Sequence, residues 1–238
     1  GALVDCARGE LLSERIKYPT PEGAAPGDVF DVIWQIVDDI GAQGAGLPLG
    51  VCVPAVVKGG HTRSAANISD EWVDLPAEAL LEERLGRDIV FLNDADAAGV
   101  AEAHYGGAKD QPGLTILTTL GTGIGSAMVL DGVLIPNTEL GHLELDGHDV
   151  ESRSSAIARQ RLGLSFEEWA LQLERYYRHL VRIFSPDLIL VGGGVSKQSE
   201  DFLPLIDAGV PIRAATLRNN AGIIGAAYLA HSTRSSRS

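Results

Sequence analysis

Short apolar segments that end in glycine or polar residues, and that alternate with helical patterns, constrain this chain more than any other feature. The stretch "VFLN" runs into "DADAAG", "LTILTTL" into "GTGIG", and "LILV" into "GGG". Apolar residues recur at helical spacing over residues 29–40 and 166–184, and residues 76–86 begin with proline and end with glycine. Strands that alternate with helices in this way predict an α/β fold.

The length of 238 residues suits either one large α/β unit or two modest lobes. We expect a small N-terminal lobe over residues 1–92 and a large lobe over residues 93–230. The last helix of the large lobe could pack on the small lobe instead. The Ser-rich residues 231–238 lack an apolar pattern and predict a frayed tail. The 28 glycines, with 45% hydrophobic and 21% charged residues, favour an aliphatic α/β enzyme with many tight turns.

Charge and composition exclude several classes of partner. A formal net charge of −13 disfavours binding to nucleic acid or to an anionic membrane. No apolar run reaches the roughly 18 residues that span a bilayer, and Cys6 and Cys52 lack zinc-like spacing. The chain opens without a signal-peptide pattern and without Met, so we expect a reduced, cytoplasmic protein with residues missing upstream of Gly1. Monomer and homodimer both stay open.

Two glycine-rich segments are candidates for binding phosphate. In "LGTGIG", the absent side chains let a ligand approach the backbone N–H groups, and a threonine hydroxyl adds a donor. "LILVGGGVS" delivers three more glycines at the end of an apolar strand. The alternatives are a hairpin that needs positive φ and a structural strand end. The candidate residues are Gly121, Thr122, Gly123, Gly125, Gly192, Gly193 and Gly194.

A carboxamide and a carboxylate lie next to each other at the end of the strand "VFLN". Asn93 and Asp94 lie where open α/β sheets bind ligands, so Asp94 is a candidate to accept a proton from a hydroxyl. Helix capping by Asn93, Asp94 or Asp96 is the simpler alternative for this position, because short polar side chains satisfy the first N–H groups of a helix.

The stretch "NTELGHLELDGHDVE" gathers two histidines and five carboxylates. Alternation predicts a strand with His142, Glu144 and Asp146 on one face. Zinc is a poor fit because carboxylates outnumber imidazoles and no cysteine is near. A glycosidase pair and a solvated acidic loop are alternatives, but carboxylates and imidazoles also suit sugar hydroxyls.

In this order, "NDADAAGVAEA", "TLGTGIGSA", "PNTELGHLELDGHD" and "LILVGGGVSK" resemble the ROK family of sugar kinases and regulators, most closely its polyphosphate glucokinase branch. The resemblance covers nearly the whole chain. It implies a two-lobed actin-like ATPase (ribonuclease-H-like) fold with a sugar-binding cleft and with donor phosphates on the glycine-rich turns.

The resemblance also implies roles for individual residues. Asp94 matches the catalytic base, and the sugar-binding positions are Ser64, Asn67, Asn93, Glu139, His142 and Glu151. Two departures stand out. "LELDGHDVESRSS" replaces the cysteine-rich zinc loop of many members, so we expect no structural zinc, and the family's first phosphate motif would end just before Gly1.

These residues predict phosphoryl transfer from polyphosphate, or also ATP, to the 6-hydroxyl of glucose or mannose, with Mg²⁺. The rivals are a sugar-sensing ROK regulator and an N-acyl amino-sugar kinase. Because a chain of net charge −13 must hold a polyanion, we expect a local basic patch. Arg153 and Arg161, eight apart and on one face if the segment is helical, are candidates, together with Arg159, Lys109, Lys197 and Arg218.

Overall fold

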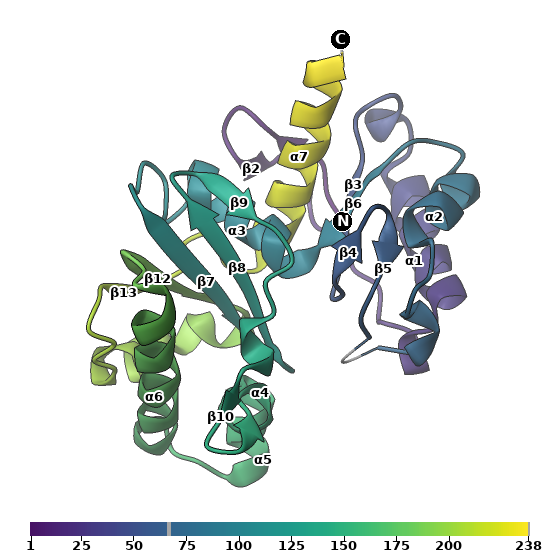
Figure 1. The fold of residues 1–238 in the computed structure, drawn as a ribbon. Helices are drawn as coiled ribbons and strands as arrows, with labels where there is room; N and C mark the ends of the chain where they lie inside the picture. Colours follow the sequence, from purple (N-terminus) through teal and green to yellow (C-terminus); the bar gives the residue numbers. More distant parts are fainter. Residues whose placement is uncertain (66–67, 238) are drawn as a thin grey trace. The chain divides into compact units, whose positions relative to one another are not determined.

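The computed structural model describes residues 1–65 and 68–237 and divides the chain into two compact units (Figure 1). The first unit holds residues 1–97 together with the C-terminal residues from Gly222 onward, and the second holds residues 98–221. The division falls after Ala97, whereas the predicted boundary lies near Leu92, and the last helix belongs to the first unit.

Two parallel strands, β3 and β6, form a small sheet in the first unit, with Gly50 opposite Val90 and Val53 opposite Asn93, and β1–β2 and β4–β5 are antiparallel pairs. Phe30 of α1 and Trp72 meet edge to face, 5.6 Å between ring centroids, within the apolar core beside these strands. The elements are β1 (Val4–Asp5), β2 (Glu10–Leu11), η1 (Glu22–Ala24), α1 (Pro26–Ile40), η2 (Gly41–Gly44), β3 (Gly50–Val53), β4 (Val57–Lys58), β5 (His61–Thr62), η3 (Asp70–Trp72), α2 (Ala77–Leu85), β6 (Val90–Asn93) and α7 (Ala221–Arg237).

The last helix, α7, packs closely on this unit. Ala226 lies in an apolar cluster with Leu92 and Ala97. A side chain at Gly50 would overlap the backbone of Ala226, so glycine allows the strand and helix to touch. The predicted frayed tail is wrong: α7 continues to Arg237, and Arg234 donates a hydrogen bond of 2.6 Å to the carbonyl oxygen of Gly46.

A five-stranded sheet in the order β13-β12-β7-β8-β9 forms the centre of the second unit (Figure 1). Strands β13 and β12 run parallel to β7, and β7, β8 and β9 are antiparallel neighbours. The elements are α3 (Asp94–Tyr105, which begins in the first unit), β7 (Leu114–Leu120), β8 (Ile124–Leu130), β9 (Val133–Ile135), η4 (Leu140–His142), β10 (Glu144–Leu145), β11 (His148–Asp149), α4 (Glu151–Ser154), α5 (Ala156–Leu162), α6 (Phe166–Phe184), β12 (Leu188–Gly192), η5 (Gly194–Asp201), η6 (Leu203–Leu205), β13 (Ile212–Ala214) and η7 (Arg218–Asn220).

Helices cover both faces of this sheet. Ile116 and its partner Met128 point toward α6 and share its core, whereas a Cβ on Gly99 of α3 would press on Ala127 from the other face. Successive strand residues point to opposite faces, so β7 and β8 are apolar on both sides. This explains why most of "LTILTTL" is buried, including the hydroxyl-bearing Thr115 and Thr118.

Helix α6 matches the predicted range of residues 166–184. It begins with a capping box, in which the Ser165 side chain accepts from the backbone of Glu168 and the Glu168 side chain accepts from the backbone of Ser165. Its buried residues recur at helical spacing and include Trp169, Leu173 and Leu180. The segment "GELLSERIKY", residues 9–18, has a strand-like composition, but the strand is limited to Glu10–Leu11.

In residues 1–65 and 68–237, the structure has no helix that combines the length and apolar character needed to cross a membrane.

Two adjacent tyrosines of α6 give a matched test of hydrogen bonding in this core. Both are fully buried, but the Tyr177 hydroxyl lies 2.9 Å from the Thr118 hydroxyl, whereas the Tyr176 hydroxyl has no partner among the described residues. Tyr177→Phe should lower the free energy of unfolding by about 1–2 kcal/mol because it strands the buried Thr118 hydroxyl. Tyr176→Phe should leave it unchanged or raise it. Urea titrations of both variants compare the two sites, and equal losses would contradict the assignment.

Candidate functional site

The segment that carries Glu139 and His142 is fixed to strand β8 of the second unit. The Ser126 hydroxyl donates to the carbonyl oxygen of Thr138 (2.6 Å) and accepts from the backbone N–H of Leu140 (2.9 Å). A Cβ at Gly141 would overlap the carbonyl oxygen of Ile124. Glycine is therefore required here for close approach to β8, which gives the glycine of the E-x-G-H pattern a physical reason.

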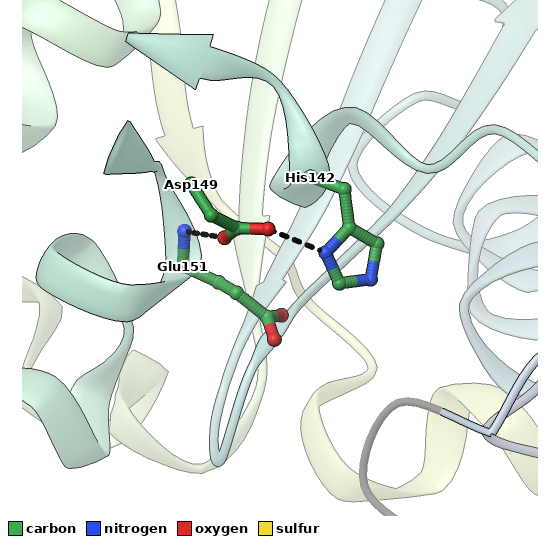
Figure 2. A group of neighbouring side chains, drawn as sticks. All are labelled: His142, Asp149 and Glu151. Atoms are coloured by element: carbon green, nitrogen blue, oxygen red, sulfur yellow. Dashed lines mark hydrogen bonds and ion pairs between the residues drawn. The ribbon is translucent and has the colours of Figure 1, made fainter. Parts of the chain in front are cut away.

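His142, Asp149 and Glu151 form a cluster beside this segment, as Figure 2 shows. The Nδ1 atom of His142 lies 2.9 Å from Oδ2 of Asp149, and its Nε2 atom lies 3.8 Å from Oε2 of Glu139. Oδ1 of Asp149 accepts from the backbone N–H of Glu151 at 3.0 Å. The cluster thus unites three predicted sugar ligands, Glu139, His142 and Glu151, with a carboxylate that sequence reasoning did not assign.

The surroundings of His142 favour its protonated form. Partial burial lowers its pKa, but the hydrogen bond with Asp149 and the negative charges of Glu151, Asp149 and Glu139 together raise that pKa above the ordinary value. A protonated imidazole donates from both nitrogens. With Nδ1 engaged by Asp149, Nε2–H is the donor that His142 offers to a ligand.

The predicted strand across His142, Glu144 and Asp146 is wrong. His142 ends the short helix η4, and β10 covers only Glu144–Leu145. Asp146 and Gly147 both have positive φ, 57° and 75°, and form the turn between β10 and β11. Two positive φ values are what a two-residue type I′ hairpin requires, so the dipeptide Asp-Gly was the missed signal. Asp146 instead pairs with Arg175 at 2.5 Å.

The "LGTGIG" turn connects β7 to β8 and has room above it. Gly121, Gly123 and Gly125 are not among the positive-φ glycines of the described chain, so the turn does not need glycine for that reason. A Cβ on Gly121 would meet no described atom within 4 Å outside its chain neighbours. The exposed side chain of Thr122 lies between these glycines. The turn is itself a hairpin, closed by the N–H of Gly121, which donates to the carbonyl oxygen of Gly123 at 3.0 Å, but positive φ does not explain its glycines. Phosphate binding on its open side stays a prediction.

Two backbone hydrogen bonds tie this turn to the residues after the cluster. Oε2 of Glu151 accepts from the backbone N–H of Ile124 at 3.0 Å, and the N–H of Ile157 donates to the carbonyl oxygen of Gly121 at 3.2 Å. The candidate phosphate turn and the candidate sugar ligands therefore belong to one connected part of the second unit.

The three glycines after β12 divide into different roles. Gly193 has a φ of 85°, and a Cβ there would overlap the backbone of Leu120, so this glycine serves the fold. Gly192 is buried at the strand end. Gly194 is exposed, begins η5 and has open space where a Cβ would lie. Of the three, Gly194 has the backbone most accessible to a phosphate.

Asn93 and Asp94 divide the tasks at the start of α3. Oδ1 of Asn93 accepts from the N–H groups of Ala95 (2.8 Å) and Asp96 (3.0 Å), and Nδ2 donates to the carbonyl oxygen of Ala55 (3.1 Å). Asn93 is therefore the helix cap, and its buried amide keeps one N–H for a ligand. The cap does not have to come from Asp94.

The side chain of Asp94 is accessible to solvent, although nearby protein atoms desolvate its carboxyl group. Its side chain is exposed, yet the surrounding protein raises the pKa of its carboxyl by desolvation, against the backbone N–H groups of Ala95 and Asp94 that lower it. The carboxyl is therefore desolvated by its surroundings and still reachable by a substrate. A raised pKa suits a carboxylate that accepts a proton.

The remaining predicted sugar ligands lie in the first unit. The Ser64 hydroxyl accepts from the backbone N–H of Val56 at 3.0 Å, which leaves its own hydrogen available to a ligand. Asn67 lies outside the described residues. Asp149, Ser126 and Gly141 are the additional residues that the structure brings to this site.

The predicted basic patch is only partly supported. The helical spacing assumed for Arg153 and Arg161 is wrong, because Ser155 has extended backbone and separates α4 from α5. Both side chains still contact the segment 148–152. Arg153 donates a hydrogen bond to His148, and Arg161 donates one to the carbonyl oxygen of Ser152. Arg159 packs over the ring of Phe166, 3.7 Å from its centroid, which explains its presence without a ligand.

The donor atoms of the cluster test its fit to a metal ion. One ligand atom each from His142, Asp149 and Glu151 lie within 4.8 Å of one another. In the structure, however, Asp149 is engaged by His142 and Glu151 by the N–H of Ile124. The described chain brings no three carboxylates together in the same way, so it offers no oxygen cage of the kind that Mg²⁺ prefers.

These features define a class of protein. The α/β units, the glycine turn over open backbone and the carboxylate-imidazole cluster correspond to the two-lobed actin-like ATPase fold. The model of the ROK family matches residues 1–158, and the chain belongs to that family.

Named relatives are similar over nearly the whole chain. A polyphosphate glucokinase of Mycobacterium tuberculosis is 42% identical over 228 residues, which cover 95% of this chain and 85% of the relative. The crystal structure of an inorganic polyphosphate/ATP-glucomannokinase from Arthrobacter sp. strain KM has a TM-score of 0.95 and 46% identity, covering 98% of this chain and 93% of that one. A ROK family glucokinase from Streptomyces griseus, in complex with glucose and AMPPNP, has a TM-score of 0.79 and 26% identity, with 96% and 94% covered.

The contact of Gly141 with β8 predicts an unequal response of two glycines. Gly141→Ala should lower the free energy of unfolding by about 1–3 kcal/mol, because the new methyl group must displace the backbone of Ile124. Gly121→Ala is the matched control and should leave stability nearly unchanged, since its Cβ meets open space. Thermal and urea unfolding of both variants measure the difference. Equal stability of the two would mean that the contact does not hold the segment.

Proposed function

We propose that this protein is a polyphosphate-dependent glucokinase that transfers a phosphoryl group to the 6-hydroxyl of glucose. The observation that carries the proposal is the likeness of nearly the whole chain to a named polyphosphate glucokinase. The arrangement of Glu139, His142 and Glu151 beside an open glycine turn supports it independently.

Asp94 is the proposed general base. It would orient the 6-hydroxyl and accept its proton while the hydroxyl oxygen forms a bond to the terminal phosphorus of the donor. The bond between that phosphorus and the next bridging oxygen breaks, and the donor leaves one phosphate shorter. The raised pKa of the Asp94 carboxyl favours this proton transfer, because a more basic carboxylate holds the proton better.

The proposed sugar ligands use complementary hydrogen bonding. Glu139 and Glu151 offer carboxylate oxygens to sugar O–H groups, and Nε2–H of His142 offers a donor to a hydroxyl oxygen. Ser64 would add a hydroxyl, and Asn93 its remaining amide hydrogen. Asn67 completes the set proposed from the family pattern.

The proposed donor site is the open backbone of the glycine turns. N–H groups at Thr122, Gly123 and Gly194 would face phosphate oxygens, while Gly192 and Gly193 allow the strand end to pack. The N–H of Gly121 already donates to the carbonyl oxygen of Gly123, and Gly125 pairs with Thr119 in the β7–β8 ladder, so these two glycines would contribute by their small size. Mg²⁺ is proposed to arrive bound to donor phosphates, because the described residues lack a carboxylate cage for it. When bound, Mg²⁺ would supply positive charge to the phosphates.

Several finer points extend the proposal. Use of ATP and of mannose is supported by the likeness to a polyphosphate/ATP-glucomannokinase. A cytoplasmic location is proposed from the phosphorylated substrates, which are intracellular metabolites. We leave monomer and homodimer as equal options.

Replacement of Asp94 separates a base from a helix cap. Asp94→Asn should lower kcat by roughly two orders of magnitude or more and leave the KM for glucose within several-fold, because the sugar contacts persist. Its thermal stability should match the parent protein. Asn93→Ala is the control with a structural effect and should lower stability by about 1 kcal/mol through loss of the cap. Near-normal kcat in Asp94→Asn would remove the base assignment.

Salt dependence tests the polyphosphate donor. Because a polyanion makes several charged contacts, its KM should rise with ionic strength more steeply than the KM for glucose. Replacing Arg153 and Arg161 with Gln should raise the KM for polyphosphate and flatten this dependence. Arg178→Gln is the control, because Arg178 already pairs with Glu174 and Asp207. Activity with ATP and none with polyphosphate would leave a glucokinase but end the polyphosphate assignment.

A further inference from the structure

Asp149 is a carboxylate that neither the base nor the sugar-ligand assignments use. It lies in strand β11, directly after the β10–β11 turn, and is half-buried. Both of its oxygens are engaged by residues that the proposed function places on the sugar (Figure 2). The contact with the backbone N–H of Glu151, two residues on, is a common Asx turn, so the contact with the His142 ring is the one that needs an explanation.

We propose that Asp149 is a positioning residue that orients His142 and Glu151 for sugar binding. The proposal rests on the proposed function, since it refines the same site. Asp149 itself is not assigned a contact with the substrate.

The two oxygens of Asp149 perform different tasks. Oδ2 lies 2.9 Å from Nδ1 of His142, which fixes the rotation of the ring and directs Nε2 away from the hairpin. Oδ1 accepts from the backbone N–H of Glu151, at the first residue of α4, where a carboxylate also suits the helix N-terminus. One side chain therefore fixes the imidazole of His142 and the backbone from which the Glu151 side chain extends.

The protein holds Asp149 in place through the hairpin. The tight Asp146-Gly147 turn pairs Glu144 with Asp149 and Leu145 with His148. Leu143 and Leu145 pack against the core of the second unit, and the backbone N–H of Val150 donates to the carbonyl oxygen of Leu143 at 3.0 Å. The hairpin is anchored on its apolar side, so its polar side presents Asp149 at a fixed place.

The negative charge of Asp149 also affects which ring nitrogens of His142 carry a proton and can donate a hydrogen bond. The groups that face the imidazole are Asp149 from β11, Glu151 from α4 and Glu139 from the residue before η4. Because Asp149 is anionic and hydrogen-bonded to Nδ1, it keeps a proton on that nitrogen and favours a second proton on Nε2. A neutral side chain at position 149 would lose this effect while keeping the shape.

The test compares Asp149→Asn with Asp146→Asn. Asp149→Asn should raise the KM for glucose by roughly tenfold, because a charge-assisted hydrogen bond is replaced by a weaker one. The value of kcat should stay within about threefold and the KM for polyphosphate should not change, since base and donor site are intact. Asp146→Asn removes a carboxylate from the same hairpin, where it forms an ion pair with Arg175 away from His142, and should have no effect.

The effect of Asp149 on the pKa of His142 can be measured without an activity assay. The pKa of His142, measured by NMR titration of the ring nitrogens, should fall in Asp149→Asn and stay constant in Asp146→Asn. If the parent protein fails to phosphorylate glucose, the proposed function fails, and the NMR titration still decides whether Asp149 controls His142.

A double-mutant cycle separates positioning from general destabilisation. If Asp149 acts largely through His142, Asp149→Asn should change the KM for glucose much less in a His142→Ala background than in the parent. Independent, additive effects would overturn the proposal, as would an unchanged His142 pKa. A stoichiometric metal ion that is lost on replacing Asp149 would also overturn it, because the cluster would then be a metal centre.

Discussion

The contact between Gly141 and the carbonyl oxygen of Ile124 is the constraint on which the candidate sugar site depends. It brings the segment 138–142 onto β8 at the residue that follows the glycine turn, and Ser126 holds the same segment by two hydrogen bonds. The central sheet thereby sets the place of Glu139 and His142. A larger residue at position 141 would separate the sugar ligands from the strand that also carries the candidate phosphate turn.

Sequence reasoning succeeded where one local pattern determined the structure. Apolar spacing predicted a helix over residues 166–184, whose limits the structure confirms, and Gly86 ends α2 as predicted, in the left-handed conformation. Asn93 shows where such reasoning stays ambiguous: an Asn-Asp pair at the start of a helix suits both capping and chemistry. Only the hydrogen bonds of Oδ1 show which residue caps the helix.

Errors arose where two patterns competed or where a contact was distant in sequence. Alternation in "HLELD" suggested a strand, but the Asp-Gly turn three residues on bends the chain into a short hairpin. The spacing of Arg153 and Arg161 assumed one helix, although Ser155 can cap a new one. Arg159 looked available for a polyanion, yet its aromatic partners Phe166 and Trp169 follow in a separate helix. No local signal reveals such a contact.

The division of labour between neighbouring residues follows from the needs of the backbone. Helix α3 requires acceptors for its first N–H groups, and Asn93 supplies them without a charge, so the carboxylate of Asp94 can remain exposed beside the helix. The same principle applies to Asp149, which satisfies the first turn of α4 and frees the side chain of Glu151 to reach the N–H of Ile124. In both places a residue that meets the structural requirement leaves its neighbour available for binding. Asn93 serves both needs, since its Oδ1 caps the helix while its amide nitrogen is proposed to reach the sugar.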